Sequence, residues 1–170
     1  HATLRRQRQM CIRDREDTSL LVENFINPVA AESRRLKSDR PDDRREALFR
    51  VTYQSWGDND AFGPVYRLMA GADPDPAVRA AALLALARHG GPEDALLFQT
   101  ALASTHRVER RAAAIFAQRV HMPDLVPFIA ERSTDAEEDV QVRRDLTVAL
   151  SQYQNDLSLI HISEPTRLSV

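Results

Sequence analysis

Apolar residues recur at helical spacing over much of this chain, and one stretch shows the pattern most clearly. It begins at Asp75 and Pro76, because Asp is a favoured N-cap and Pro a favoured first residue of a helix. Gly90 and Gly91 can adopt the left-handed conformation that ends a helix. The apolar residues between these points fall on one helical face and are Val78, Ala82, Leu83, Ala85 and Leu86. The pattern predicts an amphipathic helix that stops before the two glycines.

A second helix is predicted directly after the first. Pro92, Glu93 and Asp94 open it, with the two acidic residues near the positive end of the helix dipole. A turn at Ser104 and Thr105 closes the unit, and the apolar residues before that turn are Leu96, Leu97, Ala101 and Leu102. Together the two stretches predict a pair of antiparallel helices.

This helical pair is repeated along the chain. A shift of 31 residues places Arg79 on Arg110, and a further shift of 33 places Arg110 on Arg143. An earlier copy lies 35 residues before Arg79 and begins at Arg44. Periods of this size are typical of helical repeat proteins. The helices predicted for the other copies are 43–55 and 61–70, 108–120 and 124–132, and 140–153, and a helical pair without the repeat signature precedes them at 17–27 and 28–37.

The repetition predicts an all-α fold, an α-solenoid of about three and a half stacked antiparallel helix pairs with one further helical pair before them. The composition agrees, since the 170 residues include 23 Ala but only 5 Gly, and Ala is the best helix former. In such a stack each pair buries its apolar stripe against its neighbours. We therefore expect Leu86 and Leu150, which occupy the same place in two first helices, to be buried alike.

The repeat resembles the HEAT family, in the short bacterial form also seen in phycobilin lyase-like proteins. The resemblance covers about 41–153 and is carried by Asp73 and Arg79 with five residues between them, by Val78, Ala82, Ala85 and Leu86, and by the echoes Val142-Arg143 and Ala149-Leu150. In the family, Asp and Arg of successive repeats pair into a ladder along the stack. The resemblance implies a ladder of Asp73, Arg79, Arg110, Glu137 and Arg143. The third copy departs from the pattern with Ser104 and Glu109, which predicts a gap in the ladder there.

Both ends of the chain resemble translated sequencing adapters of the transposase type. The resemblance lies in 5–15, Arg-Arg-Gln-Arg-Gln-Met-Cys-Ile-Arg-Asp-Arg, and in 157–167, Leu-Ser-Leu-Ile-His-Ile-Ser-Glu-Pro-Thr-Arg. It implies a fragment of a longer bacterial protein between two non-native flanks. The alternative is a basic N-terminal arm and a short C-terminal tail. The implied organisation is 1–15 and 157–170 as flanks, 16–40 as the N-terminal helical pair and 41–156 as the repeat array.

Leaving out the two flanks makes the net charge of the remaining segment more negative than that of the whole chain. The whole chain has a formal net charge of −2, but the flanks hold six Arg against one Asp and one Glu, so the segment between them has 17 basic and 23 acidic residues and a net charge of −6. An acidic surface repels phosphates, which argues against a nucleic-acid partner. Cys11, the only cysteine, and His161 lie in the flanks, so no thiol or disulfide chemistry is expected. No apolar run reaches the length of a membrane span.

A helical stack exposes a long surface lined by the second helix of each unit, and such surfaces bind extended partners. The candidate contacts for a protein partner are Trp56, Phe62, Tyr66, Arg67, Gln99 and Glu131. Phe62 and Tyr66 have an alternative role in the core, and Trp56 has one in closing a gap between helices. The sequence therefore favours a non-catalytic scaffold for protein interaction.

An enzyme is the alternative, because the resemblance includes accessory enzymes of the phycobilin lyase-like class, which act on a bilin. A HEAT-like nucleic-acid binder is a further alternative that the negative charge disfavours. His89, His106 and His121 lie in different units, without the spacing of metal ligands. The acidic run 137–139 precedes a predicted helix, where acids cap the N-terminus. No P-loop, catalytic-triad spacing or dinucleotide-binding turn is present, so no cofactor, metal site or catalytic residue is predicted.

The fourth copy contributes only one predicted helix, which leaves apolar side chains without a neighbour. At least part of this group is expected to be exposed, and it consists of Leu146, Val148, Leu150 and Tyr153. Exposed apolar patches drive association. We therefore expect the chain to self-associate through its C-terminal end.

Overall fold

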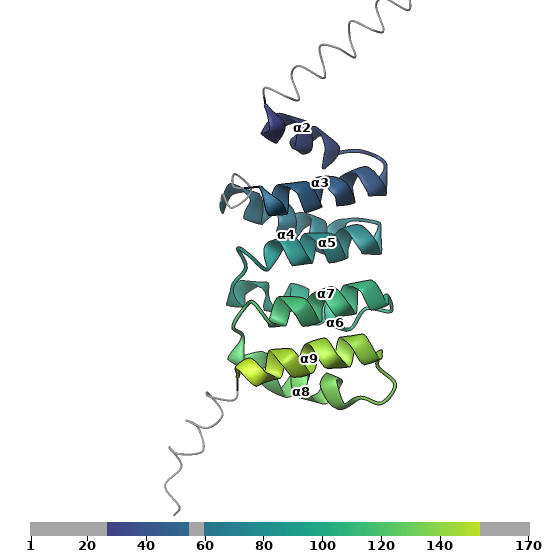
Figure 1. The fold of residues 1–170 in the computed structure, drawn as a ribbon, viewed down its shortest axis with the longest axis vertical. Helices are drawn as coiled ribbons and strands as arrows, with labels where there is room; N and C mark the ends of the chain where they lie inside the picture. Colours follow the sequence, from purple (N-terminus) through teal and green to yellow (C-terminus); the bar gives the residue numbers. More distant parts are fainter. Residues whose placement is uncertain (1–26, 55–59, 154–170) are drawn as a thin grey trace, which may run out of the picture. The chain divides into compact units, whose positions relative to one another are not determined.

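The computed structural model describes residues 27–54 and 60–153, and the regular elements in these two ranges are all helices (Figure 1). This confirms the predicted all-α fold. Sequence predictions for 1–26, 154–170 and Trp56, which include both flanks and the helix at 17–27, lie outside the described residues. The helices are α2 (Pro28–Arg35), α3 (Pro41–Tyr53), α4 (Gly63–Ala72), α5 (Pro76–Leu86), α6 (Ala95–Leu102), α7 (Arg107–Ala117), α8 (Val126–Thr134) and α9 (Val140–Gln152), with 3₁₀ turns η2 (Asp60–Phe62), η3 (Pro92–Asp94) and η4 (Pro123–Leu125) before α4, α6 and α8.

The chain divides into two compact units, residues 1–56 and residues 57–170. In the first unit α2 packs against α3. An ion pair joins the same two helices, with Arg50 Nη1 of α3 lying 3.4 Å from Glu32 Oε1 of α2. The domain boundaries at 15/16, 40/41 and 156/157 stay predictions.

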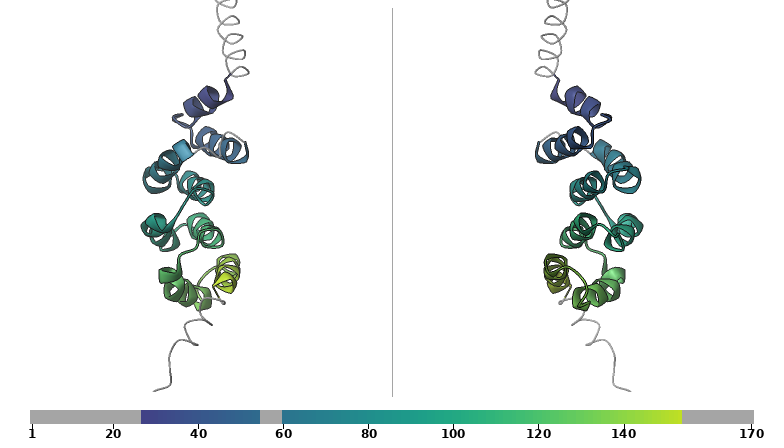
Figure 2. Two further views of the ribbon diagram at one scale, coloured as in Figure 1. Left: turned by 90° about the vertical axis from the view of Figure 1, so that its left-hand side faces the viewer. Right: turned by 90° about the vertical axis from the view of Figure 1, so that its right-hand side faces the viewer.

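The second unit consists of two layers of helices. Seen along the helices, α5, α7 and α9 form one layer and α4, α6 and α8 form the other (Figure 2). Each first helix of this unit packs against the second helix of the preceding repeat, and α5, α7 and α9 follow one another along the stack, so that α7 contacts both α6 and α9. Stacked antiparallel pairs of this kind are the predicted α-solenoid.

Local sequence signals set the starts of the helices. Asp75 caps α5, since its Oδ1 accepts hydrogen bonds from the backbone N–H groups of Ala77 at 2.8 Å and Val78 at 3.1 Å. Asp139 caps α9 in the same way. Proline occupies the first position of α3 and of α5, where its missing N–H costs no helical hydrogen bond.

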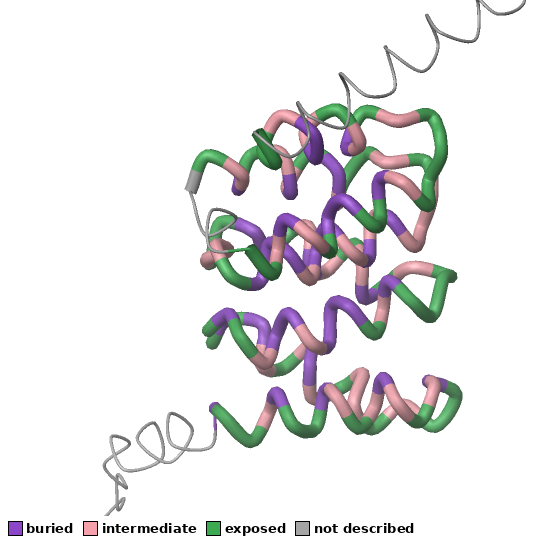
Figure 3. Tube along the Cα trace, turned by 45° about the horizontal axis from the view of Figure 1, so that its top comes forward, coloured by how far each residue is buried: buried purple, intermediate pink, exposed green. Residues whose placement is uncertain are grey.

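The core of the second unit combines alanines from the first helices with large residues from both layers. Ala82 of α5 and Ala113 of α7 are fully buried, which lets the first helices approach closely. Phe98 of α6 and Phe116 of α7 are also fully buried, and their ring centroids lie 6.5 Å apart. Figure 3 shows that buried positions recur at intervals along the helices.

The two glycines after α5 act differently from the prediction. Neither Gly90 nor Gly91 has a positive φ, so neither ends the helix in the left-handed conformation. A Cβ on Gly90 would lie 3.0 Å from the ring of Phe116 and 3.0 Å from the carbonyl oxygen of Leu86. Gly90 is therefore suited to its place because the chain passes close to a core aromatic ring.

The end of the described array is less exposed than predicted. Leu146 and Tyr153 are buried, whereas Leu150 is half-buried and Val148 is 44% exposed. The Tyr153 hydroxyl accepts a hydrogen bond from Met122 N at 2.9 Å and donates one to Val120 O at 3.2 Å. The expectation of exposure was therefore wrong for Leu146 and Tyr153, because Tyr153 packs across the turn between α7 and α8.

Leu86 and Leu150 are not buried alike, because in the part of the chain that the structure describes only the helix of Leu86 has a further first helix packed on it. Leu86 is fully buried because α5 has α7 as a neighbour, whereas no further first helix packs on α9 among the described residues. We expect Leu86→Ala to lower the free energy of unfolding by about 2–5 kcal/mol through the cavity it leaves. Leu150→Ala should cost clearly less. Urea denaturation of the two variants measures both costs, and equal losses would contradict the described packing.

Candidate functional site

The first helices α3, α5, α7 and α9 each carry an arginine as their fourth residue, and in α3, α5 and α7 this residue ties the helix to the turn before it. The four residues are Arg44, Arg79, Arg110 and Arg143. In the first three repeats the Nη1 group donates to the carbonyl oxygen six residues earlier, that of Ser38 at 2.8 Å, of Asp73 at 2.7 Å and of Ser104 at 2.9 Å. The arginine thus satisfies a carbonyl at the start of its own repeat.

The turns themselves are built alike. Each has a serine or aspartate whose side-chain oxygen accepts the backbone N–H of the residue two positions later. The hydrogen bonds are 2.9 Å long at Asp73, 3.0 Å at Ser104 and 3.0 Å at Asp135. At Ser38 the distance is 3.2 Å. The turn residue marks the start of each repeat more regularly than the acids of the expected ladder do.

The arginines of two repeats also reach an acid of the following repeat. Arg79 Nε donates to Glu109 Oε1. Arg110 Nε donates to both carboxylate oxygens of Glu138, at 2.9 and 3.0 Å. The Glu138 side chain is only 1% exposed. Hydrogen bonds to charged groups are stronger than neutral ones, and these join successive repeats along the stack.

The acids in these contacts differ from those that the resemblance implied. The gap expected at the third copy is filled, because Glu109 accepts from Arg79 and also from the Ser104 hydroxyl. The acid that meets Arg110 is Glu138 and not Glu137, which is exposed. The turn residue precedes the arginine by eight positions in the fourth copy and by six in the others. The two extra residues change which acid lies next to the arginine of the preceding repeat.

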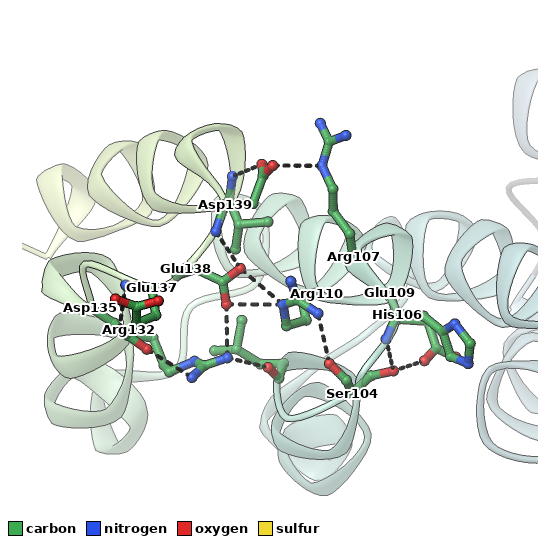
Figure 4. A network of polar contacts seen from close by, with 12 residues as sticks. Ser104, His106, Arg107, Glu109, Arg110, Arg132, Asp135, Glu137, Glu138 and Asp139 are labelled. Carbon is green, nitrogen blue, oxygen red and sulfur yellow. Dashed lines mark hydrogen bonds and ion pairs between the residues drawn. The ribbon is translucent and has the colours of Figure 1, made fainter.

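Glu138 is the centre of a larger network of charged groups (Figure 4). Arg132 Nη2 of α8 donates to Glu138 Oε2 at 2.8 Å, and its Nη1 donates to Asp135 Oδ2 at 3.2 Å. Nearby, Arg107 Nε lies 3.0 Å from Asp139 Oδ2. Desolvation acts to raise the pKa of Asp139, but its hydrogen bonds from backbone N–H groups and from Arg107 outweigh this and leave the pKa below its ordinary value.

The last arginine of the series has a different environment. Arg143 Nε is buried and has no hydrogen-bond partner among the described residues. The ladder therefore consists of Arg79 with Glu109 and Arg110 with Glu138, and within the described residues it does not continue through Arg143.

The predicted partner contacts fall into different environments. Tyr66 is fully buried, so it belongs to the core and not to an exposed surface. Its ring lies 6.0 Å from that of Phe62, which is half-buried, and 5.8 Å from that of His89. Gln99 is half-buried and Glu131 is exposed.

Arg67 is held by acids of the next repeat. Its Nε lies 2.6 Å from Asp94 Oδ1, and its Nη2 lies 3.1 Å from Asp94 Oδ2 and 2.8 Å from Glu93 Oε1. The hydrogen bond to Asp94 raises the pKa of the Arg67 guanidinium above its ordinary value. Arg67 is therefore positioned by the fold, with 35% of its side chain still exposed.

Sequence reasoning missed several exposed apolar residues. Leu68 of α4 and Leu96 of α6 are 68% and 73% exposed, and both lie on second helices. In the first unit, Phe49 and Tyr53 of α3 are exposed with their ring centroids 4.6 Å apart. The signal was available for Phe49, Tyr53 and Leu68, which fall outside the apolar stripes of their helices. Leu96 is among the apolar residues of its predicted helix, and the structure exposes it instead.

Two further features, a metal site and a membrane-spanning helix, are absent from the described ranges. No group of three His, Cys, Asp or Glu residues that could hold a metal ion occurs there. None of the helices described is both long and apolar enough to cross a membrane.

The network around Glu138 yields a test of the ladder. Glu138→Ala leaves the Arg110 and Arg132 donors without their shared acceptor and should lower the free energy of unfolding by about 1–3 kcal/mol. Glu137→Ala, at the neighbouring exposed position, should change it by less than about 0.5 kcal/mol. Urea denaturation compares the two, and a larger loss from Glu137→Ala would show that the acids are wrongly assigned.

Comparison with known sequences agrees with this architecture. The profile of the family described as HEAT repeats matches residues 31–117, just over half of the 170 residues. No curated protein and no solved structure matches the chain significantly. The matched stretch includes α3 to α7 and with them Arg44, Arg79 and Arg110, the three arginines that donate to their own turns. The chain belongs to the HEAT repeat family.

Proposed function

We propose that this protein is a non-catalytic scaffold that binds an extended segment of a partner protein along the layer formed by α4, α6 and α8. HEAT repeats form scaffolds that often serve protein interaction. The observation that carries the proposal is the exposure of Leu68 and Leu96 on this layer. Burying a leucine side chain contributes about 1.5–3 kcal/mol, so two of them give a partner a substantial apolar contact.

The helical register explains why these leucines face outward. In α4 the buried residues are Gly63, Tyr66 and Met69, which recur every three positions on the face toward the core. Leu68 lies about 100° away from Met69 around the helix axis. It therefore does not contribute to the core stripe and is free to contact a partner.

Three polar residues on the same helices and one aromatic residue before α4 complete the proposed surface. Glu131 of α8 is exposed, and Gln99 of α6 and Phe62 before α4 are half-buried. Arg67 keeps part of its guanidinium exposed while two acids hold it in place. We retain these four residues as proposed contacts, together with Trp56, which lies outside the described residues.

Selection from a random peptide library displayed on phage tests this proposal. The chain should select peptides whose binding is lost when Leu68→Asp and Leu96→Asp are combined. The matched control is Val108→Asp, because Val108 of α7 is 50% exposed but belongs to the layer of first helices. Peptides that tolerate the double variant and fail with Val108→Asp would place the contact surface on the other layer.

We also propose that the chain self-associates through α9. Support comes from Val140 and Val148 of α9, which are 65% and 44% exposed. The surface is smaller than the sequence suggested, since Leu146 and Tyr153 are buried.

Light scattering over a concentration series measures this association. The mean mass should rise with concentration, and Val148→Glu should reduce the rise because it places a charge in the apolar patch. Val108→Glu, on α7, is the control and should leave the rise unchanged. A constant monomer mass for the unmodified chain would refute the proposed self-association.

A further inference from the structure

A pocket of about 360 Å³ in the second unit is lined by residues of α4, α5 and α6, by the turn after α6 and by Glu109 of α7. Its apolar lining is Ala70, Gly71, Ala80, Leu83, Leu97 and Ala101. Arg79, Ser104 and Glu109 form part of its polar lining. A Cβ on Gly71 would lie 3.2 Å from Leu97 Cδ2, so the glycine lets α4 lie close to α6 without filling the pocket.

The next repeat has a long side chain where this pocket is open. Ala101 of α6 and Arg132 of α8 occupy the same position, since each lies three residues before the turn residue of the following repeat, Ser104 or Asp135. Ala101 lines the open pocket. Arg132 instead extends its guanidinium toward the end of α6, with Nη2 at 3.5 Å from Leu102 O. The alanine thus leaves empty a space that an arginine fills one repeat later.

The acceptors that hold Arg132 have counterparts in the open pocket. Arg132 donates to Glu138, the acid that also accepts from the ladder residue Arg110 (Figure 4). The corresponding acid is Glu109, which accepts from the ladder residue Arg79 and lines the pocket. The turn residues Asp135 and Ser104 correspond in the same way, although serine brings no charge.

From this correspondence we propose that the pocket binds an arginine side chain of the partner segment, with its guanidinium at Glu109 in the way that Arg132 lies at Glu138. This inference rests on the proposed function, since it assigns one side chain of the segment that binds α4, α6 and α8. The aliphatic stem of the arginine would lie along Leu83, Leu97 and Ala101, as arginine stems cover apolar surface while the charged head remains polar.

A second guanidinium beside the ladder arginine is compatible with this fold. Arg110 and Arg132 already share Glu138. Arg79 directs its Nη1 away to the carbonyl oxygens of Asp73 and Pro74, at 2.7 and 3.2 Å. Glu109 then accepts from Arg79 through Oε1 and from Ser104 through Oε2, and a carboxylate has about four acceptor sites in all. Glu109 thus has acceptor capacity left for a ligand.

The chemistry favours guanidinium over other groups. A planar guanidinium donates in fixed directions and suits a carboxylate flanked by neutral oxygens, whereas an ammonium is a compact and strongly hydrated charge. An apolar side chain would fill the alanine-lined part but leave the remaining acceptor sites of Glu109 unused. We therefore expect arginine to bind more tightly than citrulline, which has the same shape without the charge.

Nuclear magnetic resonance of the ¹⁵N-labelled full chain tests whether the pocket binds an arginine side chain. N-acetylarginine methylamide should shift the amide signals of Gly71, Ala101 and Thr105. N-acetylcitrulline methylamide should bind about tenfold more weakly, because it lacks a charge-assisted hydrogen bond. Equal binding of the two compounds, or shifts confined to residues away from the pocket, would overturn the proposal.

Two matched variants test whether the arginine binds in the pocket at Ala101. Ala101→Arg puts into α6 the side chain that α8 has at this position, and it should weaken binding of N-acetylarginine methylamide about tenfold or more. Ala103→Arg adds the same charge at an exposed position of the same segment and should leave the affinity within about twofold. Equal effects of the two variants would overturn the assignment. Peptides that bind through Leu68 and Leu96 without needing arginine, and that tolerate Ala101→Arg, would refute this pocket but leave the scaffold proposal standing.

Discussion

The architecture depends on the hydrogen bonds of one arginine, the fourth residue of each first helix. In Arg79 and Arg110 the guanidinium donates to a carbonyl oxygen of its own turn and to a carboxylate of the next repeat. It can do both because its donors point in fixed and different directions. One side chain therefore fixes a turn and joins a neighbouring repeat, which explains why the arginine keeps its place while the acids change between copies.

The two helical layers meet different packing requirements. The first helices pack closely against one another, and this layer includes fully buried alanines such as Ala82 and Ala113. The second helices contact each other much less. The spaces between neighbouring second helices are therefore filled or left open according to the side chain at each position. Arg132 occupies one such space, whereas Ala101 leaves the preceding one open.

This difference connects the fold with the proposed function. The layer of first helices is constrained by close packing and by the arginine contacts. The layer of second helices carries the exposed leucines and borders the open pocket, whose lining also includes the ladder residues Arg79 and Glu109. A partner segment bound there would meet apolar surface first and a carboxylate, Glu109, at the edge of the pocket.

The sequence by itself determined the helices, their order and the repeat, because N-caps such as Asp75, first-position prolines and apolar spacing act within a few residues. It also located the arginines. Only the tertiary structure decided that Glu138 and not Glu137 meets Arg110, since a turn longer by two residues redirects the acids. Likewise, the open space at Ala101 depends on how neighbouring helices are placed against one another, which no local pattern encodes.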